Sequence, residues 1–369
     1  MYGADAVYLG GSKFGMRSTA IVDNKFLKEA VELVHSHGKK VYVTVNIFAR
    51  NRDFDEIKTY VKYLESIKVD AVIVSDLGVM RLVRENTKLE IHVSTQTNVL
   101  NKYTASEYVK LGARRIILAR ECSLTEITEI ATHVNRKCDI EIFVHGAMCV
   151  SYSGRCMLSN YMTGRESNRG ECAHPCRWKY ALVEEKRPDQ YFPIEEDSHG
   201  TYIMNSKDLC LINHIDELVA AGVTSFKIEG RNKSEYYVSA TVNAYRRALD
   251  AEKFDYMEEI NKTSHRPWTT GFVFNENDHL YTKTADAKST HQVVAQVIGG
   301  NEISLRNFFS VGDKLEILSP GKNHNKTFTV TNIRDDTGQE ITRANKAGYT
   351  YFLDCHYTLQ ADEFLRKKL

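Results

Sequence analysis

The sequence has no run of about eighteen apolar residues, the length that a membrane-spanning helix requires. It also shows no secretory signal peptide. We therefore expect a cytoplasmic protein that is not associated with a membrane. The charges nearly cancel, with 49 Lys and Arg against 48 Asp and Glu and a net charge of +1. This balance argues against bulk non-specific binding of nucleic acid, although it still allows a local basic face.

Several catalytic motifs are also missing. No G-x-G-x-x-G follows an expected strand, which removes the main indication of a dinucleotide-binding sheet. Neither the H-E-x-x-H of zinc proteases nor the G-x-S-x-G of serine hydrolases occurs. For a protease, the remaining nucleophile candidates are Ser153 and Cys149, the latter close to His145. A cysteine protease needs one thiolate of low pKa, whereas this chain clusters four thiols in one segment.

The composition is that of a globular protein with one large and one small domain. The chain has 369 residues, of which 42% are hydrophobic and 26% charged. We predict an α/β domain over residues 1–252, with a cysteine-rich insertion at about 146–200. A polar connector at 253–288 and a small β-barrel domain at 289–369 would follow.

Strand-like and helix-like segments alternate through the large domain, which predicts parallel strands covered by helices. A doubly wound sheet and a TIM-type (βα)8 barrel both satisfy this pattern, and we favour the barrel. The expected strands lie at residues 6–9, 41–47, 71–74, 91–93, 115–118, 140–144, 202–204 and 225–228. The helix expected at 54–67 has an apolar stripe of Ile57, Tyr60, Val61 and Leu64.

Polar residues stand just after many of these strands. In a (βα)8 barrel such positions converge on one face, where the active site lies. Alternatively, each residue could simply cap the next helix, as Ser123 does in a capping box with Glu126. The polar residues that follow strands are Asn46, Asp76, Ser94, Gln96, Arg120, His145, Asn205, Glu229 and Arg231.

From Gln292 onward the pattern changes to short alternating strands separated by glycine-containing turns. This pattern is typical of a small β-barrel domain. The strands are expected in the segments VVAQVI, EISLRN, DKLEIL, KTFTVTNI and YTYFL.

A cysteine-rich segment follows the strand that ends near His145. Four of the eight cysteines form a C-x6-C-x15-C-x3-C array among turn-forming residues. Such a segment buries too little apolar surface to order itself, so the thiols are expected to hold it together. These cysteines are Cys149, Cys156, Cys172 and Cys176.

Three kinds of link could join these thiols. Disulfides need an oxidising compartment. Structural zinc usually comes with two short C-x2–4-C knuckles, and only Cys172 and Cys176 have that spacing. An iron–sulfur cluster accepts four thiolates at irregular spacing. The spacing therefore favours an iron–sulfur cluster, with zinc as the alternative. A further interpretation is that these are ordinary buried thiols.

Other side chains near the array are candidates for chemistry. His145 could exchange a proton near neutral pH, or it could be a hydrogen-bonded structural histidine. We select His145, Tyr152 and Glu229 as catalytic candidates. Arginines in this region suit phosphate or carboxylate groups, or are solvated loop charges. The substrate-binding candidates are Asn46, Gln96, Arg120, Arg155, Lys207 and Arg231.

Several long segments resemble the U32 "peptidase" family. The main one is HGAMCVSYSGRCMLSNYMTGRESNRGECAHPCRW, and the resemblance runs from Tyr2 to about Arg231, continuing more weakly to the C-terminus. The other segments, in the family's order, are YGADAVYLGGSKFGMR, VYVTVN, VIVSDLG, HVSTQTN, YIMNSKDL and FKIEGR. Several long motifs in one order make this resemblance specific.

Within that family the chain is most similar to members that support 5-hydroxyuridine formation at the wobble position of tRNA. The resemblance implies a tRNA-modifying enzyme with a 4Fe-4S cluster on Cys149, Cys156, Cys172 and Cys176. It also implies prephenate, a dicarboxylate, as co-substrate, and a homo-oligomer or hetero-oligomer with a family paralogue as a possible assembly. Relatives that act on ribosomal RNA or on other substrates, and collagenase-like proteases, define the alternatives.

The chain departs from the family pattern in one respect. Members usually begin with an extra strand, roughly E-L-L-x-P-A-G, ahead of the segment YGADAVYLG. This sequence starts at Met1–Tyr2 and lacks that segment. Either the sequence is truncated here or another element fills the gap. Without its first strand, a barrel would have an open seam with unpaired backbone groups.

Overall fold

The computed structural model describes most of both predicted domains and parts of the segment between them. Each of two units is considered by itself. The parallel-sheet unit comprises Asp5–Arg231 and Pro267–Asp286, and the C-terminal unit comprises Met1–Ala4, Asn232–Arg266 and Ala287–Leu369. The described residues are 1–11, 13–15, 23–148, 152, 155–165, 173, 175, 183–184, 187–191, 196–197, 200–201, 205–230, 233–274, 280–281 and 288–369.

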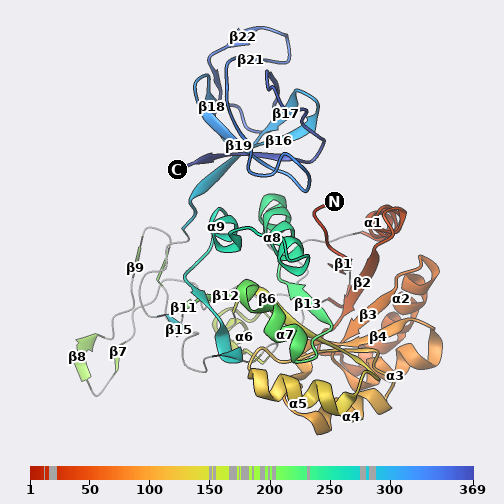
Figure 1. Ribbon diagram of the computed structural model, residues 1–369. Helices are drawn as coiled ribbons and strands as arrows, with labels where there is room; N and C mark the ends of the chain where they lie inside the picture. Colours follow the sequence, from red (N-terminus) through yellow and green to blue (C-terminus); the bar gives the residue numbers. More distant parts are fainter. Residues whose placement is uncertain are drawn as a thin grey trace. The chain divides into compact units, whose positions relative to one another are not determined.

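A parallel sheet forms the centre of the first unit (Figure 1). Its strands pair in the order in which they occur in the chain, and the last one pairs with β6. The strands are β1 (Ala6–Gly10), β2 (Lys40–Val45), β3 (Ala71–Val74), β4 (Glu90–Val93), β5 (Arg115–Ile117), β6 (Asp139–Ala147) and β13 (Ser225–Ile228). The prediction of an α/β domain built on a parallel sheet is confirmed.

The sheet is curled, because side chains from strands that are not neighbours meet on one of its faces. The Lys227 Nζ on β13 lies 4.1 Å from the ring centroid of Tyr8 on β1. The ring of Tyr42 on β2 lies 4.6 Å from that of His92 on β4. These contacts span several strand widths, so this face must be concave.

Helices follow most of the strands, as the alternation predicts. On α2 the buried residues are Ile57, Tyr60, Val61 and Leu64, which is the predicted stripe. The Ser123 hydroxyl accepts from the Glu126 backbone N–H, and the Glu126 carboxylate accepts in return, confirming the capping box. The helices are α1 (Asn24–Ser36), α2 (Phe54–Ser66), α3 (Leu77–Asn86), α4 (Lys102–Lys110), α5 (Leu124–Val134) and α7 (Ile215–Ala220), with short 3-10 turns at Asn51–Asp53, Thr95–Thr97 and Ile212–His214.

An additional strand runs against the direction of the parallel sheet. β12 (Asp208–Cys210) pairs with β6 in antiparallel orientation, and β14 (Trp268–Thr269) pairs with β12. Part of the predicted connector therefore contributes a strand to this sheet. Shorter elements of the same unit are α6 (Leu158–Thr163), β7 (Val183–Glu184), β8 (Arg187–Tyr191), β9 (Glu196–Asp197), β10 (Gly200–Thr201), β11 (Asn205–Ser206), a 3-10 turn at Gly271–Val273 and β15 (Leu280–Tyr281).

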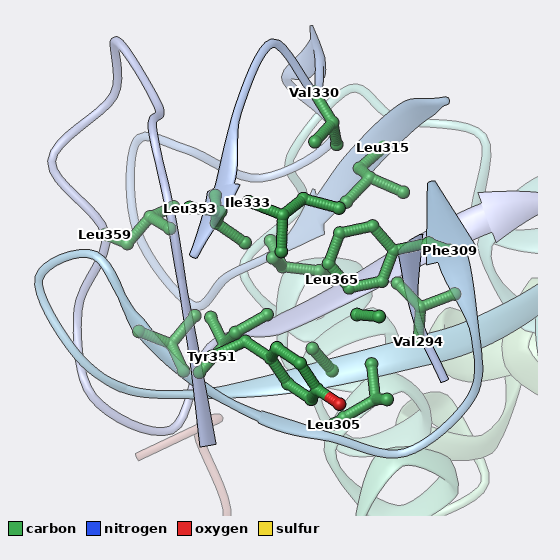
Figure 2. Close-up of a cluster of buried hydrophobic side chains, with 14 of the residues drawn as sticks. Val294, Leu305, Phe309, Leu315, Val330, Ile333, Tyr351, Leu353, Leu359 and Leu365 are labelled. Atoms are coloured by element: carbon green, nitrogen blue, oxygen red, sulfur yellow. The ribbon is translucent and has the colours of Figure 1, made fainter. Parts of the chain in front are cut away.

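The C-terminal unit is an antiparallel sheet that curls around its own core (Figure 2). Its core includes Val294, Phe309, Leu315, Tyr351 and Leu365, all buried. Two helices belong to this unit, α8 (Glu235–Leu249) and α9 (Tyr256–Asn261). The strands are β16 (His291–Gly299), β17 (Glu302–Leu305), β18 (Phe309–Ser310), β19 (Lys314–Leu318), β20 (Thr327–Thr329), β21 (Ile333–Arg334), β22 (Glu340–Ile341), β23 (Arg343–Ala344), β24 (Thr350–Leu353) and β25 (Phe364–Lys368).

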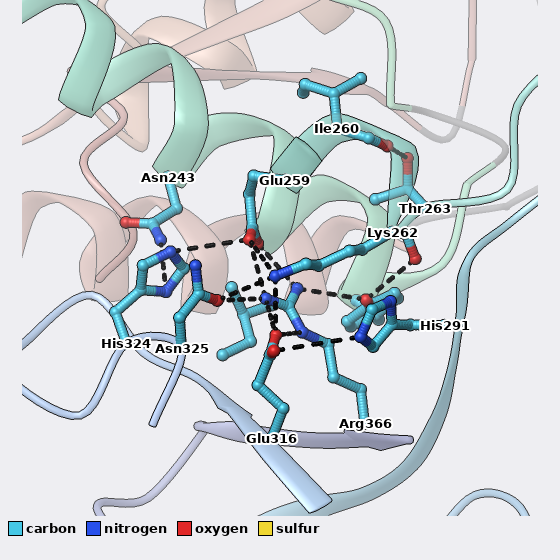
Figure 3. Close-up of polar contacts among 12 residues, drawn as sticks. Asn243, Glu259, Ile260, Lys262, Thr263, His291, Glu316, His324, Asn325 and Arg366 are labelled. Atoms are coloured by element: carbon cyan, nitrogen blue, oxygen red, sulfur yellow. Dashed lines mark hydrogen bonds and ion pairs between the residues drawn. The ribbon is translucent and has the colours of Figure 1, made fainter. Parts of the chain in front are cut away.

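A buried charged cluster joins α9 to this antiparallel sheet (Figure 3). The Arg366 guanidinium on β25 donates two hydrogen bonds to the Glu259 carboxylate at 2.7 and 2.8 Å, and a third to Glu316 at 2.8 Å. Lys262 completes the cluster, with its Nζ 2.9 Å from a Glu316 oxygen. Two cations thus face two carboxylates, and the side chains of Arg366 and Glu259 are fully shielded from solvent.

Among the described helices, none combines the length and the apolar character that crossing a membrane requires. The predicted boundaries of the domains and of the connector stay predictions.

Candidate functional site

The carboxyl ends of β2 and β4 are linked by buried polar side chains. Asn46 follows β2, and its amide donates to the Ser94 hydroxyl at 3.4 Å. Ser94 in turn donates to the Gln96 side-chain oxygen at 3.2 Å. Asn46 and Gln96 are both buried. The structure therefore brings these two predicted substrate-binding residues together through one serine.

Capping explains one of the other polar residues that follow strands. The Asp76 carboxylate accepts from the Val79 backbone N–H at 3.0 Å and caps α3. This hydrogen bond satisfies an amide that the first turn of a helix leaves without an intrahelical acceptor. Asp76 therefore has a structural explanation.

Arg120 connects the end of β5 to the end of β6. One of its terminal nitrogens donates to the Ala147 carbonyl at 3.1 Å, and its guanidinium carbon lies 4.0 Å from the ring centroid of Phe143. A hydrogen bond and a cation–π contact together orient the planar guanidinium. Arg120 is half-buried.

His145 lies on β6, and Glu229 directly follows the neighbouring strand β13. The Glu229 backbone N–H donates to the His145 carbonyl at 3.0 Å, and the His145 side chain is buried. Gly146 has a φ of +115°, and a Cβ there would stand 2.7 Å from the Glu229 Cβ. Both the backbone conformation and this close approach favour glycine, so Gly146 allows β6 to carry His145 beside Glu229.

Trp268, which belongs to the predicted connector, is a neighbour of His145. The two ring centroids lie 5.1 Å apart with planes inclined by 46°. The contact exists because β14 joins β12, which pairs with β6 opposite His145. Trp268 lies more than a hundred residues after His145, and no local pattern links the two positions.

The cysteine-rich segment is described only in part. Cys156 is half-buried and lies two residues before α6. Cys149, Cys172, Cys176 and Arg231 lie outside the described residues. In the part of the chain that the structure describes, no group of three or more His, Cys, Asp and Glu side chains is arranged to hold a metal ion.

Two other candidates precede Cys156. The Arg155 guanidinium lies 5.5 Å from the ring centroid of Phe48, which follows β2 shortly after Asn46. The Arg155 backbone N–H donates to the Tyr152 carbonyl at 3.0 Å, and the Tyr152 side chain is exposed.

A further candidate, Lys207, is half-buried and directly precedes β12. The roles predicted for these residues stay predictions.

A charged layer that the sequence did not predict lies on the concave face of the sheet. The Glu141 carboxylate accepts from Lys227 at 3.0 Å, from Arg115 at 3.1 Å and from Ser225 at 2.8 Å. Burial by itself would raise the pKa of Glu141, but Lys227 and Arg115 lower it to about 2. Glu141 alternates with apolar residues of β6, and that position in a buried strand was the available signal.

The same layer includes a buried neutral histidine. Burial first, and then the nearby Arg115, lower the pKa of His92 to about 3. Both Arg115 and His92 contact the ring of Tyr42, at 5.3 Å and 4.6 Å from its centroid. The layer therefore carries two cations, one carboxylate and a neutral imidazole beneath the polar strand ends.

Two family models cover nearly the whole chain. The model of peptidase family U32 matches residues 1–283, and the model of the peptidase family U32 C-terminal domain matches residues 289–366.

The chain is also similar to several curated proteins that are named for RNA hydroxylation or 5-hydroxycytidine synthesis. The chain is 36% identical to tRNA hydroxylation protein P of Escherichia coli, over 95% of this chain and 89% of that protein. It is 37% identical to tRNA hydroxylation protein P1 of Bacillus subtilis, over 93% of this chain and 85% of that protein. It is also 36% identical to the 23S rRNA 5-hydroxycytidine C2501 synthase of Escherichia coli, over 74% of this chain and 42% of that protein. The resemblance inferred from the sequence motifs is thus confirmed, and the chain belongs to peptidase family U32.

Proposed function

We propose that this chain is an RNA-modifying hydroxylase that supports formation of 5-hydroxyuridine at the wobble position of tRNA. The observation that carries the proposal is similarity to tRNA hydroxylation proteins over 95% and 93% of the chain. Similarity of that extent includes both the sheet that carries the candidate site and the C-terminal β-domain. It favours a shared activity over a shared fold alone.

The scaffold that we infer is a TIM-type barrel with a small β-barrel domain. Tyr8 on the first strand of the parallel sheet meets Lys227 on the last across the concave face, which is how a barrel interior is filled. The polar strand ends at Asn46, Gln96 and Arg120 then belong to the face where barrel enzymes place their chemistry.

In this proposal Cys149, Cys156, Cys172 and Cys176 hold a 4Fe-4S cluster, and zinc is the alternative occupant. A cluster bound there would supply electron transfer or polarise a bound group. Support comes from the spacing of the array and from Cys156, which is half-buried beside a helix of this segment.

The arginines of the candidate site suit a dicarboxylate such as prephenate. Arg120 is oriented by Phe143 and the Ala147 carbonyl, and Arg155 lies against Phe48. A guanidinium held by an aromatic ring keeps the fork geometry that pairs with a carboxylate. Lys207 and Arg231 are the further cationic candidates in this binding role.

Proton transfer is assigned to groups next to the cysteine segment. We assign proton exchange to His145, which is buried, and to Glu229, whose backbone N–H donates to the His145 carbonyl. Tyr152 is exposed on the cysteine-rich side and can approach a bound base. Asn46 and Gln96 present amide groups that suit hydrogen bonding to a substrate. We place this activity in the cytoplasm, alone or in an oligomer with a paralogue.

The proposal is tested in a strain that lacks the gene and carries either the intact chain or Cys156→Ala. Mass spectrometry of tRNA nucleosides should show the wobble hydroxyl with the intact chain and its loss with Cys156→Ala. Cys355→Ala is the matched control, because Cys355 is a half-buried cysteine of the other unit. If the hydroxyl persists in the deletion strain, the tRNA assignment is wrong.

The cofactor is tested separately on protein purified without air. Iron and sulfide should each be close to four per chain in the intact protein and in Cys355→Ala, and strongly reduced in Cys156→Ala. A colourless preparation with one zinc per chain would instead indicate a structural zinc site. Peptide cleavage that survives replacement of Cys172 and Cys176 by serine would favour a protease.

A second candidate is hydroxylation of ribosomal RNA. The observation that favours it is the similarity to the 23S rRNA synthase over 74% of this chain, although the match includes only 42% of that protein. Nucleosides of ribosomal RNA measured in the same strains separate the two candidates.

A further inference from the structure

Two neighbouring phenylalanines of the C-terminal unit have opposite environments. Phe309 on β18 is fully buried in the core, where Figure 2 shows it among aliphatic side chains. Phe308, just before it, has 47% of its surface exposed. Alternation along an extended chain explains the direction of Phe308. It does not explain why a second large apolar ring is placed where solvent reaches it.

A second exposed ring belongs to a connection that runs beside the one with Phe308. The 306–308 segment joins β17 to β18, and the 345–349 segment joins β23 to β24. β17 pairs with β24 and β18 pairs with β23, so both connections bridge the same two strand pairs. The Leu305 backbone N–H donates to the Tyr349 carbonyl, and the Gly348 N–H donates to the Leu305 carbonyl, so the two connections are held together. Tyr349 is 56% exposed.

Each exposed ring is accompanied by cationic side chains. The Arg343 guanidinium carbon lies 4.5 Å and the Lys367 Nζ 5.1 Å from the ring centroid of Phe308. The Lys346 Nζ lies 5.6 Å from the ring centroid of Tyr349. Single exposed aromatic residues are common on protein surfaces. Two rings in adjacent connections, each with a cation at its side, form a more specific arrangement.

The charge of this face differs from that of the whole chain. Residues 306–314, 342–349 and 367 contain five basic side chains and one acidic side chain, whereas the net charge of the chain is +1. Arg306 and Lys367 are ion-paired with Glu235 and Asp313. Arg343 and Lys346 are exposed and lie next to the rings. The local excess of positive charge matches a polyanion.

We propose that this face, defined by Phe308, Arg343, Lys346, Tyr349 and Lys367, binds a single-stranded segment of the RNA substrate. Bases stack on Phe308 and Tyr349 while Arg343 and Lys346 contact backbone phosphates, which is the usual combination for unpaired RNA. This inference rests on the proposed function and adds to it a location for substrate binding. An apolar protein partner would not account for the cations, so RNA fits the observations best.

The test measures binding of unmodified tRNA to the full chain by fluorescence anisotropy over a range of KCl concentrations. Phe308→Ala and Tyr349→Ala should each weaken binding about tenfold without changing the salt dependence, because they remove stacking. The double variant Arg343→Gln/Lys346→Gln should weaken binding and reduce the slope of log K against log salt by about 1.4, or about 0.7 for each lost phosphate contact.

Matched controls come from elsewhere on the surface. Phe26→Ala removes a ring of α1 that is 56% exposed, and Arg334→Gln removes an arginine of β21 that is paired with Asp354. Both should bind tRNA like the intact chain. Thermal unfolding followed by circular dichroism should show all variants folded, because every substituted side chain is at least partly exposed.

The outcomes separate this inference from the proposed function. If the face variants bind tRNA as tightly as the intact chain and restore the wobble hydroxyl in the deletion strain, the inference is wrong and the proposed function stands. If they lose the hydroxyl at unchanged tRNA affinity, the face acts in a step other than RNA binding and the inference is also wrong. If the face variants bind tRNA more weakly but deletion of the gene leaves the wobble hydroxyl intact, the RNA-binding face is supported and the proposed function is contradicted.

Discussion

The two units each bury a charged cluster, and the clusters differ in balance and in shielding. In the parallel-sheet unit, Arg115 and Lys227 share Glu141, and Arg115 reaches out to Asp139, a carboxylate that is half exposed. In the C-terminal unit, Arg366 and Lys262 face Glu259 and Glu316 (Figure 3). In the first cluster, Arg115 is therefore also paired with a carboxylate that solvent reaches. In the second, the side chains of Arg366 and Glu259 are both fully shielded from solvent.

The difference indicates what each cluster can contribute. A buried ion pair gains little over a well-packed apolar pair, but removing one partner is costly because a charge is left uncompensated. Both clusters join elements far apart in the sequence, β6 with β13 in one case and α9 with β25 in the other. They therefore specify which elements pack together, and the better shielded cluster should be the more sensitive to loss of a partner.

The largest effect is expected for Glu259→Gln. This change leaves the fully buried Arg366 without its bidentate partner and should lower the unfolding free energy of the C-terminal unit by about 4 kcal/mol. Hydrogen exchange of amides in α9 and β25 measures that loss. Glu258→Gln is the control, because Glu258 also lies near Lys262 but is 68% exposed. Equal effects of the two substitutions would contradict the argument from shielding.

A smaller effect is expected for Glu141→Gln. Arg115 keeps its ion pair with Asp139 at 3.0 Å and is 14% exposed, so its charge remains partly compensated. We expect a loss of about 3 kcal/mol, measured by hydrogen exchange of amides in β6 and β13. Glu90→Gln, at an exposed carboxylate near His92, should change stability by less than about 0.5 kcal/mol. A loss larger than that of Glu259→Gln would reverse the ranking of the two clusters.

The pH dependence of stability tests His324, a buried histidine beside the charged cluster of the C-terminal unit. Burial, only partly opposed by Glu259, lowers the pKa of His324 to about 4. The unfolded chain therefore binds a proton between about pH 6.5 and 4 that the folded unit does not, so stability falls as pH decreases through this window. We expect a slope of about 1 kcal/mol per pH unit from His324. His324→Gln should reduce the slope of urea-unfolding stability against pH in that range, and an unchanged slope would contradict the assignment to His324.

The smallest effect is expected for Ser123→Ala, which removes a local hydrogen bond at an exposed helix start. Loss of an N-cap of this kind lowers the unfolding free energy by about 1 kcal/mol. Urea unfolding measures the change, and Thr128→Ala, at an exposed position on the same helix, provides the reference. A loss as large as that for Glu141→Gln would mean that burial is not what makes the clusters sensitive.

Local sequence patterns predicted much of the secondary structure of the parallel-sheet unit. The buried stripe of α2, the capping box of α5 and most of the parallel strands follow from side-chain periodicity and short-range hydrogen bonds. The segment at 202–204 was expected to be a strand of the parallel sheet, but those residues lie outside the described part. The described strands on either side of it, β10 and β11, pair outside the parallel sheet. The next strand along the chain, β12, joins the sheet but runs antiparallel to β6. Strand direction depends on the path of a long connection, so local periodicity does not encode it.

The candidate site shows the same division. The location of Asn46, Gln96 and Arg120 at strand ends was predictable, because the end of a parallel strand is recognisable from sequence. Trp268 beside His145 was not recognisable, because β14 enters the sheet from a segment that reads as a polar connector.

By itself, the sequence determined the family, the alternation of strands and helices, the antiparallel C-terminal domain and the clustering of four cysteines, because each depends on residue types at short spacing. Only the tertiary structure decided which charges are buried together. Arg366 stands in FLRKK, a strand in which three of the five residues are basic, yet its side chain is fully buried. Its environment comes from Glu259 and Glu316, which are 107 and 50 residues away. A charge can be buried only where its partners converge, and that convergence is a property of the folded chain.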